Sequence, residues 1–354
     1  MLNQLTRGLG RAARGLAAAA VVMGAVGAAQ ADEITGAGAT FPAPIYTKWG
    51  EDYAKAAKTT LNYQGVGSGA GVTQIINRTV DFGASDAPVA ADKLSQNNLL
   101  QFPAVIGAVV IMVNIPGVDG NNINLSGDVV ADIYQGKIRL WNDARIKALN
   151  AGVNLPAVAV APAYRADSSG TTNIFTSYLS AVSATFKTGV GAGNAVAWKT
   201  GVGAPGNAGV AAAVQNTKGG IGYVEYAYAT ENKMQTPMLQ NANKKFVPPT
   251  EAGFNAAATQ ANWATAQNMA ASMLNLPGDS TWPIVSATYI LLPKNPANPA
   301  RAKAVLTFFD WAFKNGAPQA TALHYIPLPA AVQAQVRKSW ADIKDAKGKP
   351  VSAG

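Results

Sequence analysis

Small hydroxyl residues and glycines gather at four places where the sequence predicts a helix start. These segments are residues 36–44, 65–71, 81–88 and 164–172. The first backbone N–H groups of a helix have no acceptor within the helix, and the helix dipole places partial positive charge beside them. Such helix starts bind oxyanions without needing many basic side chains. The spacing therefore predicts an oxyanion site built from several helix starts.

The first segment, residues 36–44, reads Gly-Ala-Gly-Ala-Thr-Phe-Pro-Ala-Pro. Thr40 suits a capping position, and Pro42 suits the first position of a helix. We therefore take Thr40 as a candidate ligand and expect its side chain to cap the helix. An ordinary capped helix start remains the alternative for this segment taken alone.

The second segment, residues 65–71, is rich in glycine and resembles the loops that cradle phosphate groups. It fits the dinucleotide pattern G-x-G-x-x-G/A loosely, and Asp86 has the spacing of the ribose contact in that pattern. No Gly-Lys-Ser/Thr follows, so the P-loop pattern is absent. A second match to the dinucleotide pattern, at residues 201–206, contains Pro205 in a loop-like stretch. Both nucleotide-binding interpretations are therefore disfavoured.

Asp86 in the third segment follows a predicted strand, at the strand end where ligands of open α/β sheets gather. A carboxylate repels a fully ionised anion, but hydrogen phosphate carries a proton whose hydrogen bond Asp86 can accept. Sulfate has no such proton, and a buried acceptor left unpaired rejects an analogue by roughly 10⁴-fold or more. The alternative is a turn residue that caps its own backbone.

The fourth segment, residues 164–172, gives the strongest single signal. Arg165 offers a planar fork for two oxygens of an oxyanion, and Ser169 and Thr171 offer hydroxyl groups at the start of a helix. Asp167 has the position to orient Arg165. A surface ion pair beside a capped helix is the alternative for this segment.

Strand-like and helix-like runs alternate along the chain, which favours an α/β fold with parallel strands. The two apolar segments 109–114 and 284–292 lie beside prolines and predict either a two-strand hinge between lobes or two central strands of one sheet. The strands are predicted at residues 60–64, 80–84, 102–114, 157–164 and 284–292. The helices are predicted at residues 43–55, 71–77, 128–134, 172–181, 208–215, 263–274, 301–315 and 330–345.

The first 31 residues have the pattern of a cleavable signal peptide. Three arginines precede an apolar run at 15–28, and Ala29-Gln30-Ala31 matches the A-x-A cleavage pattern. We expect the mature chain to begin at Asp32 and to fold into two domains. Because residues 1–31 contain no acidic residue, the loss of their three arginines lowers the formal charge from +9 to +6.

The remaining basic residues are scattered singly, which disfavours nucleic acid as a partner. The chain has no cysteine, so it has neither disulfides nor thiolate metal sites, and we expect no cofactor or metal. It has one histidine, His324, and lacks the G-x-S-x-G and HExxH patterns. These features disfavour a secreted hydrolase such as a phosphoesterase. A binding protein for sulfate or molybdate is disfavoured by Asp86, and a sensor or an adhesin on the same fold stays open.

Five short motifs, taken together and in this order, resemble the phosphate-binding proteins of phosphate-specific ABC transporters, the PstS family. The motifs are GAGATFPAP, NYQGVGSGAGV, DFGASDAP, YRADSSGTT and GYVEYAYA, and the similarity continues through WPIVSATYIL and FFDWAFKNGA. The resemblance implies a type II periplasmic-binding-protein fold, in which two α/β lobes joined by a two-strand hinge enclose phosphate in a cleft. It also implies periplasmic phosphate capture and delivery to inner-membrane permease subunits.

The resemblance assigns phosphate contacts residue by residue. It implies that the first lobe contributes Thr40, the backbone of Phe41, Ser68 and Asp86, and that the second lobe contributes Arg165, Ser169, Gly170 and Thr171. Asp167 matches an acidic partner of the arginine. Two departures concern the shape of the pocket: Ser168 stands where the family often has glycine, and a second serine of the family is absent at or near Ala70.

The corresponding domain division places lobe I at residues 32–113 plus 286–354 and lobe II at residues 114–285. We expect the mature protein to be a monomer without enzymatic activity.

Overall fold

The computed structural model describes residues 33–353, so the predicted signal peptide lies outside the described residues. Among the described residues, no helix is long and apolar enough to cross a membrane. The helices are α1 Ala43–Ala57, α2 Ser68–Ile76, α3 Ala91–Gln96, α4 Gly127–Tyr134, α5 Ala144–Leu149, α6 Gly170–Val182, α7 Ala184–Gly189, α8 Gly206–Gln215, α9 Tyr226–Glu231, α10 Glu251–Ala258, α11 Pro299–Asn315, α12 Ala317–Ala322 and α13 Ala330–Ser339.

Within residues 33–353, the strands form one large sheet and one small one. Their bounds are β1 Glu33–Gly38, β2 Thr60–Gly65, β3 Phe82–Ser85, β4 Leu99–Asn114, β5 Asn124–Leu125, β6 Ala161–Arg165, β7 Val202–Ala204, β8 Gly220–Glu225, β9 Met238–Gln240, β10 Phe246–Val247, β11 Met273–Leu274 and β12 Ile284–Pro293. The large sheet has the order β2-β1-β3-β12-β4-β8-β6-β7, with β11 paired to β12, and β10-β9-β5 form the small sheet. Short 3₁₀ helices lie at Gly120–Asn122, Gln267–Met269 and Trp340–Asp342.

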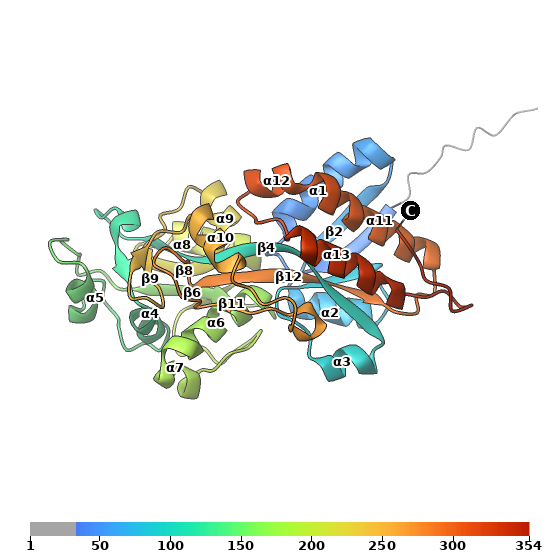
Figure 1. The fold of residues 1–354 in the computed structure, drawn as a ribbon. Helices are drawn as coiled ribbons and strands as arrows, with labels where there is room; N and C mark the ends of the chain where they lie inside the picture. Colours follow the sequence, from blue (N-terminus) through green and yellow to red (C-terminus); the bar gives the residue numbers. More distant parts are fainter. Residues whose placement is uncertain (1–32, 354) are drawn as a thin grey trace, which may run out of the picture. The chain divides into compact units, whose positions relative to one another are not determined.

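The long strand β4 divides the large sheet into two halves. Its residues Leu99–Ala108 pair with β12, and its residues Val109–Asn114 pair with β8. We call β1–β3, β12 and helices α1–α3 and α11–α13 the first half, and β6–β8 with helices α4–α9 the second half. β4 and β12 run side by side through the middle, with the helices of the two halves at opposite ends (Figure 1).

Apolar sequence explains why β4 lies at the centre. Every residue of β4 except Asn114 is buried, as expected for a strand covered on both faces. Aromatic side chains from distant segments complete the core of the first half: Phe309 of α11 makes edge-on contacts with Tyr46, Phe82 and Phe102. In the second half, Phe175 of α6 stacks on Tyr223 of β8.

The structure confirms most predicted elements and corrects three expectations. The sheet is mixed, because β12 runs antiparallel to both β3 and β4, and β4 runs antiparallel to β8. The helix predicted at 263–274 is wrong: this stretch contains only a short 3₁₀ turn and then β11. The helix predicted at 330–345 ends at Ser339 and continues as a 3₁₀ turn to Asp342.

Left-handed backbone explains the missing helix at 263–274. Asn268 and Met269 have φ values of 51° and 55°, which interrupt the helical hydrogen-bond ladder. The carbonyl of Asn268 instead accepts a hydrogen bond from the Gln101 side chain at 3.1 Å, and Met273 pairs with Val285 of β12. Contacts with the sheet therefore override the apolar pattern that predicted a helix.

Candidate functional site

Thr40 and Phe41 lie in the turn between β1 and α1, but Thr40 does not cap the helix as expected. The residue preceding α1 is Pro42, and no side chain caps that end. The Thr40 hydroxyl instead accepts two hydrogen bonds from Asn207 of the second half, from its side-chain amide at 2.8 Å and its backbone N–H at 3.2 Å. The phenyl ring of Phe41 is buried in the core, and its carbonyl oxygen accepts a hydrogen bond from Tyr325.

Ser68 is the first residue of α2, three residues earlier than the predicted helix start. Gly67 precedes it with a φ of 95°, a conformation that favours glycine, and turns the chain from β2 into the helix. The Ser68 side chain is fully buried, and its hydroxyl oxygen accepts hydrogen bonds from the backbone N–H groups of Asp86 at 3.2 Å and Gly170 at 3.0 Å. Ser68 thus joins the two halves of the fold.

Asp86 follows the last residue of β3, as predicted, and its carboxyl group is buried. One carboxyl oxygen accepts a hydrogen bond from the Thr288 hydroxyl at 2.9 Å, and the other lies 3.5 Å from the Ser68 hydroxyl. Burial raises the pKa of Asp86 to about 7, although the hydrogen bond from Thr288 and the charge of Arg165 act in the opposite direction. These contacts differ from the self-capping turn that was the alternative for Asp86.

Arg165 is the last residue of β6, and its guanidinium group is almost wholly buried. Both Nε and the Nη2 nitrogen of Arg165 donate to the carboxylate of Asp167, and the Nη1 nitrogen donates to the Thr171 hydroxyl at 3.2 Å. Burial by itself would raise the pKa of Asp167, but the hydrogen bonds and charge of Arg165 outweigh it and hold the pKa below its ordinary value. Asp167 therefore stays ionised and orients the guanidinium group.

Helix α6 begins shortly after Arg165 and Asp167 in the chain. The Ser169 hydroxyl caps the helix by accepting a hydrogen bond from the N–H of Thr172 at 3.1 Å. Gly170 and Thr171 are the next two residues, and neither backbone N–H group has an acceptor inside the helix; that of Gly170 donates to the Ser68 hydroxyl at 3.0 Å. Gly170 must be small, because a Cβ atom there would lie 2.5 Å from the Ser68 hydroxyl oxygen and 2.6 Å from Cβ of Asp86.

The eight candidate ligands and Asp167 thus lie together, although they come from segments up to 131 residues apart in sequence. Contacts between the two halves bring them together. Besides the Gly170–Ser68 bond, the N–H of Gly69 donates to the carbonyl of Ser168 at 2.9 Å, and the Tyr228 hydroxyl donates to the carbonyl of Thr40 at 2.6 Å.

Sequence reasoning missed several polar residues that hold the site. Thr288 on β12 contacts Asp86, and Asn207 near the start of α8 bridges Thr40 and Thr171. Tyr223 on β8 accepts a hydrogen bond from the N–H of Arg165 at 3.1 Å. Tyr223 lies in the GYVEYAYA motif, which was the one sequence signal for it. Asn207 follows the glycine-rich stretch 201–206, whose proline disfavours a nucleotide-binding loop.

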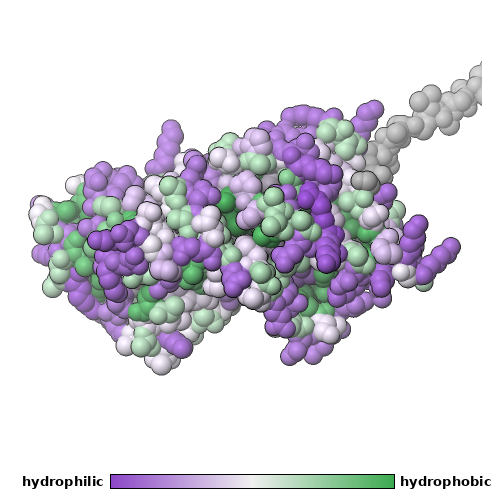
Figure 2. Space-filling model, viewed as in Figure 1, coloured by the Kyte–Doolittle hydropathy of each residue, from purple (hydrophilic) through white to green (hydrophobic). Residues whose placement is uncertain are grey.

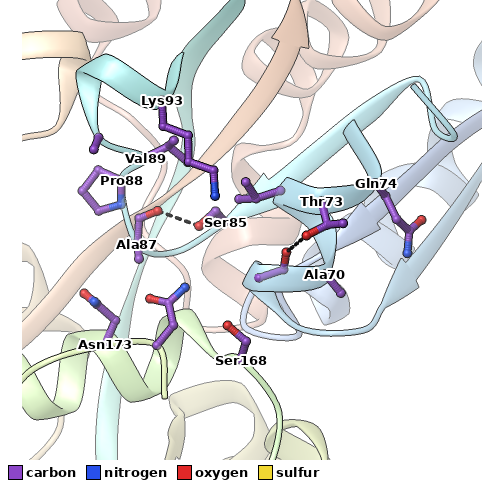
Figure 3. A pocket seen from close by; sticks show the side chains of 14 residues that line it. Ala70, Thr73, Gln74, Ser85, Ala87, Pro88, Val89, Lys93, Ser168 and Asn173 are labelled. Atoms are coloured by element: carbon purple, nitrogen blue, oxygen red, sulfur yellow. Dashed lines mark hydrogen bonds between the residues drawn. The ribbon is translucent and has the colours of Figure 1, made fainter. Parts of the chain in front are cut away.

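A groove of about 790 Å³ adjoins the site and separates α2 and α3 from α6. The outline of the space-filling view is notched between the parts that carry α3 and α6 (Figure 2). Figure 3 shows Lys93 of α3 on one wall of the groove and Asn173 of α6 on the other. Ser85 and Ser168 also line this groove, and each is the chain neighbour of a candidate ligand.

The arrangement suits a protonated oxyanion. Arg165, the hydroxyl groups and the helix-start N–H groups offer hydrogen-bond donors, and the carboxyl of Asp86 offers the acceptor. Among residues 33–353, no group of three or more His, Cys, Asp or Glu side chains has a geometry that fits a metal ion. A single helix-start amide or charged hydrogen bond is weak, but several such donors lie together here.

Comparison with known proteins places the chain in a family. A family model described as a PBP superfamily domain matches residues 24–315. The phosphate-binding protein PstS of Pasteurella multocida is 49% identical over 321 residues, which cover 90% of this chain and 93% of that protein. PstS of Haemophilus influenzae is 47% identical over 320 residues, which cover 90% of this chain and 96% of that protein.

Solved structures show the same fold at lower identity. The phosphate-bound periplasmic phosphate-binding protein PfluDING aligns with a TM-score of 0.71 and 23% identity, over 91% of this chain and 96% of that chain. A phosphate-binding protein from Stenotrophomonas maltophilia aligns with a TM-score of 0.66 and 21% identity, over 86% of this chain and 93% of that chain. The fold is therefore the two-lobed periplasmic-binding-protein fold, and the chain belongs to the PstS family of phosphate-binding proteins.

Proposed function

We propose that this protein binds inorganic phosphate between its two lobes, through Thr40, Phe41, Ser68, Asp86, Arg165, Ser169, Gly170 and Thr171, and passes it to an ABC transporter permease for import. It acts as a binding protein and not as an enzyme. The observation that carries the proposal is that a buried arginine, two helix starts and one buried carboxyl group lie in one hydrogen-bonded cluster between the halves.

Asp86 gives the site its selectivity. A buried carboxyl group whose pKa is about 7 is ionised in a large fraction of the molecules at neutral pH, and the ionised form accepts a hydrogen bond from a protonated phosphate oxygen. Sulfate has no proton to donate, so a sulfate oxygen and the carboxylate of Asp86, both negatively charged, would face each other. We therefore expect phosphate to be preferred over sulfate.

The number of contacts is sufficient for tight binding. Charge-assisted hydrogen bonds contribute about 1.5–3 kcal/mol each, and micromolar affinity corresponds to about −8 kcal/mol. Four such bonds contribute about 6–12 kcal/mol, and six or more contribute about 9 kcal/mol or more, which leaves a margin for the ordering of the lobes on closure. Micromolar or tighter affinity is therefore within reach of this site.

In this proposal the two lobes have the boundaries predicted from the sequence: lobe I is 32–113 plus 286–354, and lobe II is 114–285. The support is the pairing of β4, which changes partner from β12 to β8 between Ala108 and Val109, close to the predicted boundary. We propose β4 and β12 as the two hinge strands.

The working form is proposed to be a periplasmic monomer that starts at Asp32 after removal of the signal peptide 1–31. Nucleic acid is not a proposed partner, because the basic residues form no run, and several of them are paired with acidic side chains, such as Arg145 with Asp132. The proposed partners are phosphate and the permease subunits of the inner membrane.

Titration calorimetry on phosphate-stripped residues 32–354 tests the proposal. We expect one phosphate per chain, weak sulfate binding, and a loss of about 10²-fold or more in Arg165→Met, which removes charge-assisted hydrogen bonds. Arg139→Met is the matched control, because Arg139 is exposed and its Nε donates only to the carbonyl of Gly136. Absence of phosphate binding, or equal affinity of Arg165→Met and the unaltered protein, would refute the proposal.

A further inference from the structure

Three hydroxyl groups of the proposed site have no remaining capacity to accept a hydrogen bond. A hydroxyl group has two lone pairs and one hydrogen. The Ser68 oxygen accepts from the backbone N–H groups of Asp86 and Gly170. The Thr171 oxygen accepts from Arg165 and from Asn207, both at 3.2 Å. The Thr40 oxygen is the third, because it also accepts two hydrogen bonds.

Both lone pairs of Thr40 are occupied by one residue. Asn207 donates to the Thr40 oxygen from its side-chain amide at 2.8 Å and from its backbone N–H at 3.2 Å. The two hydrogens of the Asn207 side-chain amide are thereby divided between Thr40 of the first half and Thr171 of the second half. Asn207 itself is fully buried, so water does not compete for these bonds.

The orientation of the Asn207 amide is fixed by the backbone of β8. The backbone N–H of Glu225 donates to Oδ1 of Asn207 at 3.0 Å. An N–H group only donates, so the atom that faces Glu225 must be the oxygen, and the nitrogen must face the two threonines. The neighbouring Gly206 holds this turn by donating its N–H to Asp167 at 3.0 Å.

We propose that Asn207 is a positioning residue that sets the direction of the hydroxyl protons of Thr40 and Thr171, so that both protons point to the bound anion. This inference rests on the proposed function of the site. With these hydroxyls fixed as donors, the acceptors left among the proposed ligand side chains are the carboxyl of Asp86 and the second lone pair of the Ser169 hydroxyl, and of the two only the carboxyl can carry a charge. Asn207 therefore contributes to the selection of an oxyanion that carries a proton, without contacting that oxyanion.

Asn207→Asp tests the inference with a side chain of the same shape. The introduced carboxylate keeps an oxygen toward Glu225 but presents a second oxygen to the threonines, which then donate to position 207 and not to phosphate. We expect phosphate affinity to fall about 10²-fold or more at pH 8. Protonation of that carboxyl restores a donor, so the affinity ratio between the unaltered protein and the variant should shrink as the pH is lowered to 5.

Two further variants separate this role from general damage. Asn207→Leu removes the donors without adding a titrating group, so its loss of affinity should have the same ratio at every pH. Asn216→Asp adds a carboxyl at the exposed end of the same helix, where Asn216 caps α8, and should leave affinity unchanged. Calorimetry from pH 5 to pH 8 and thermal unfolding are measured for each purified protein.

The inference is overturned if Asn207→Asp binds phosphate like the unaltered protein, or if its affinity ratio is independent of pH. If the variants at position 207 do not fold, neutron diffraction of the deuterated, unaltered phosphate complex decides the matter. Deuterium atoms of Thr40 and Thr171 that point to phosphate support the inference, and deuterium atoms that point to Asn207 overturn it. Failure of the unaltered protein to bind phosphate at all would instead overturn the proposed function.

Discussion

Replacing Asp86 by asparagine should change the pH dependence of folding stability in the phosphate-free protein. The pKa of Asp86 rises from 3.8 to about 7 in the folded protein, chiefly because the carboxyl is buried. The unfolded chain therefore releases this proton near pH 4, while the folded protein holds it until about pH 7. The stability that comes from a neutral Asp86 is full below pH 3.8 and is lost as the pH rises to about 7.

The size of the effect follows from this shift. Three pKa units correspond to about 4 kcal/mol at 1.36 kcal/mol per unit. The variant does not lose this stability as the pH rises, because asparagine does not ionise. Against this, the amide introduced at position 86 faces the Ser68 oxygen, which already accepts two hydrogen bonds, and an unpaired buried donor costs about 1–3 kcal/mol. Asp86→Asn should thus be less stable than the unaltered protein at pH 4 and more stable at pH 7.

Urea unfolding of phosphate-stripped protein at several pH values between 4 and 8 measures this difference. The free energy of unfolding of Asp86→Asn, minus that of the unaltered protein, should rise by about 3 kcal/mol between pH 4 and pH 7. Carboxyl groups that do not interact with Asp86 contribute equally to both proteins and cancel, whereas Glu225 and Asp167 interact with its charge. A difference that stays constant across this range would refute the claim that Asp86 is held neutral by burial.

Three further predictions concern binding, packing and kinetics. Asp86→Asn should relax discrimination against sulfate in competition calorimetry, and unchanged discrimination would contradict the role of Asp86 as the acceptor. Gly71→Ala should lower the melting temperature, with a loss of stability of about 1–3 kcal/mol, because the alanine Cβ would lie 2.5 Å from Cα of Gly38. An unchanged melting curve would show that the helix adjusts. Lys93→Glu should slow phosphate association several-fold at low salt in stopped-flow measurements, because Lys93 lines the groove beside the site. If association is slowed equally at high salt, the effect is not electrostatic steering.

Local signals in the sequence predicted the helix starts and many of the candidate ligands. Arg165 and Ser169 were predictable because a strand end, a cap and a helix start follow one another within a few residues. The α11 helix was predictable because its apolar residues recur at helical spacing and pack against the first half. In these cases residues that are close together in the sequence determine the local structure.

Contacts between distant segments set the features that sequence reasoning missed. Asn207 carries no local pattern that marks it, because its role depends on Thr40, which lies 167 residues earlier in the chain. Thr40 fits the pattern of a helix cap, but Asn207 occupies its hydroxyl oxygen instead. The antiparallel course of β12 likewise depends on how β4 crosses the sheet, which alternating strands and helices do not reveal.

The crystal structure of residues 32–354 grown with phosphate is the most direct test of the account. We predict one phosphate ion between the lobes, within hydrogen-bond distance of the Arg165 guanidinium, the Asp86 carboxyl, the Ser68 hydroxyl and the N–H groups at the start of α6. A phosphate ion found only elsewhere, such as in the groove beside Lys93, would contradict the proposed site.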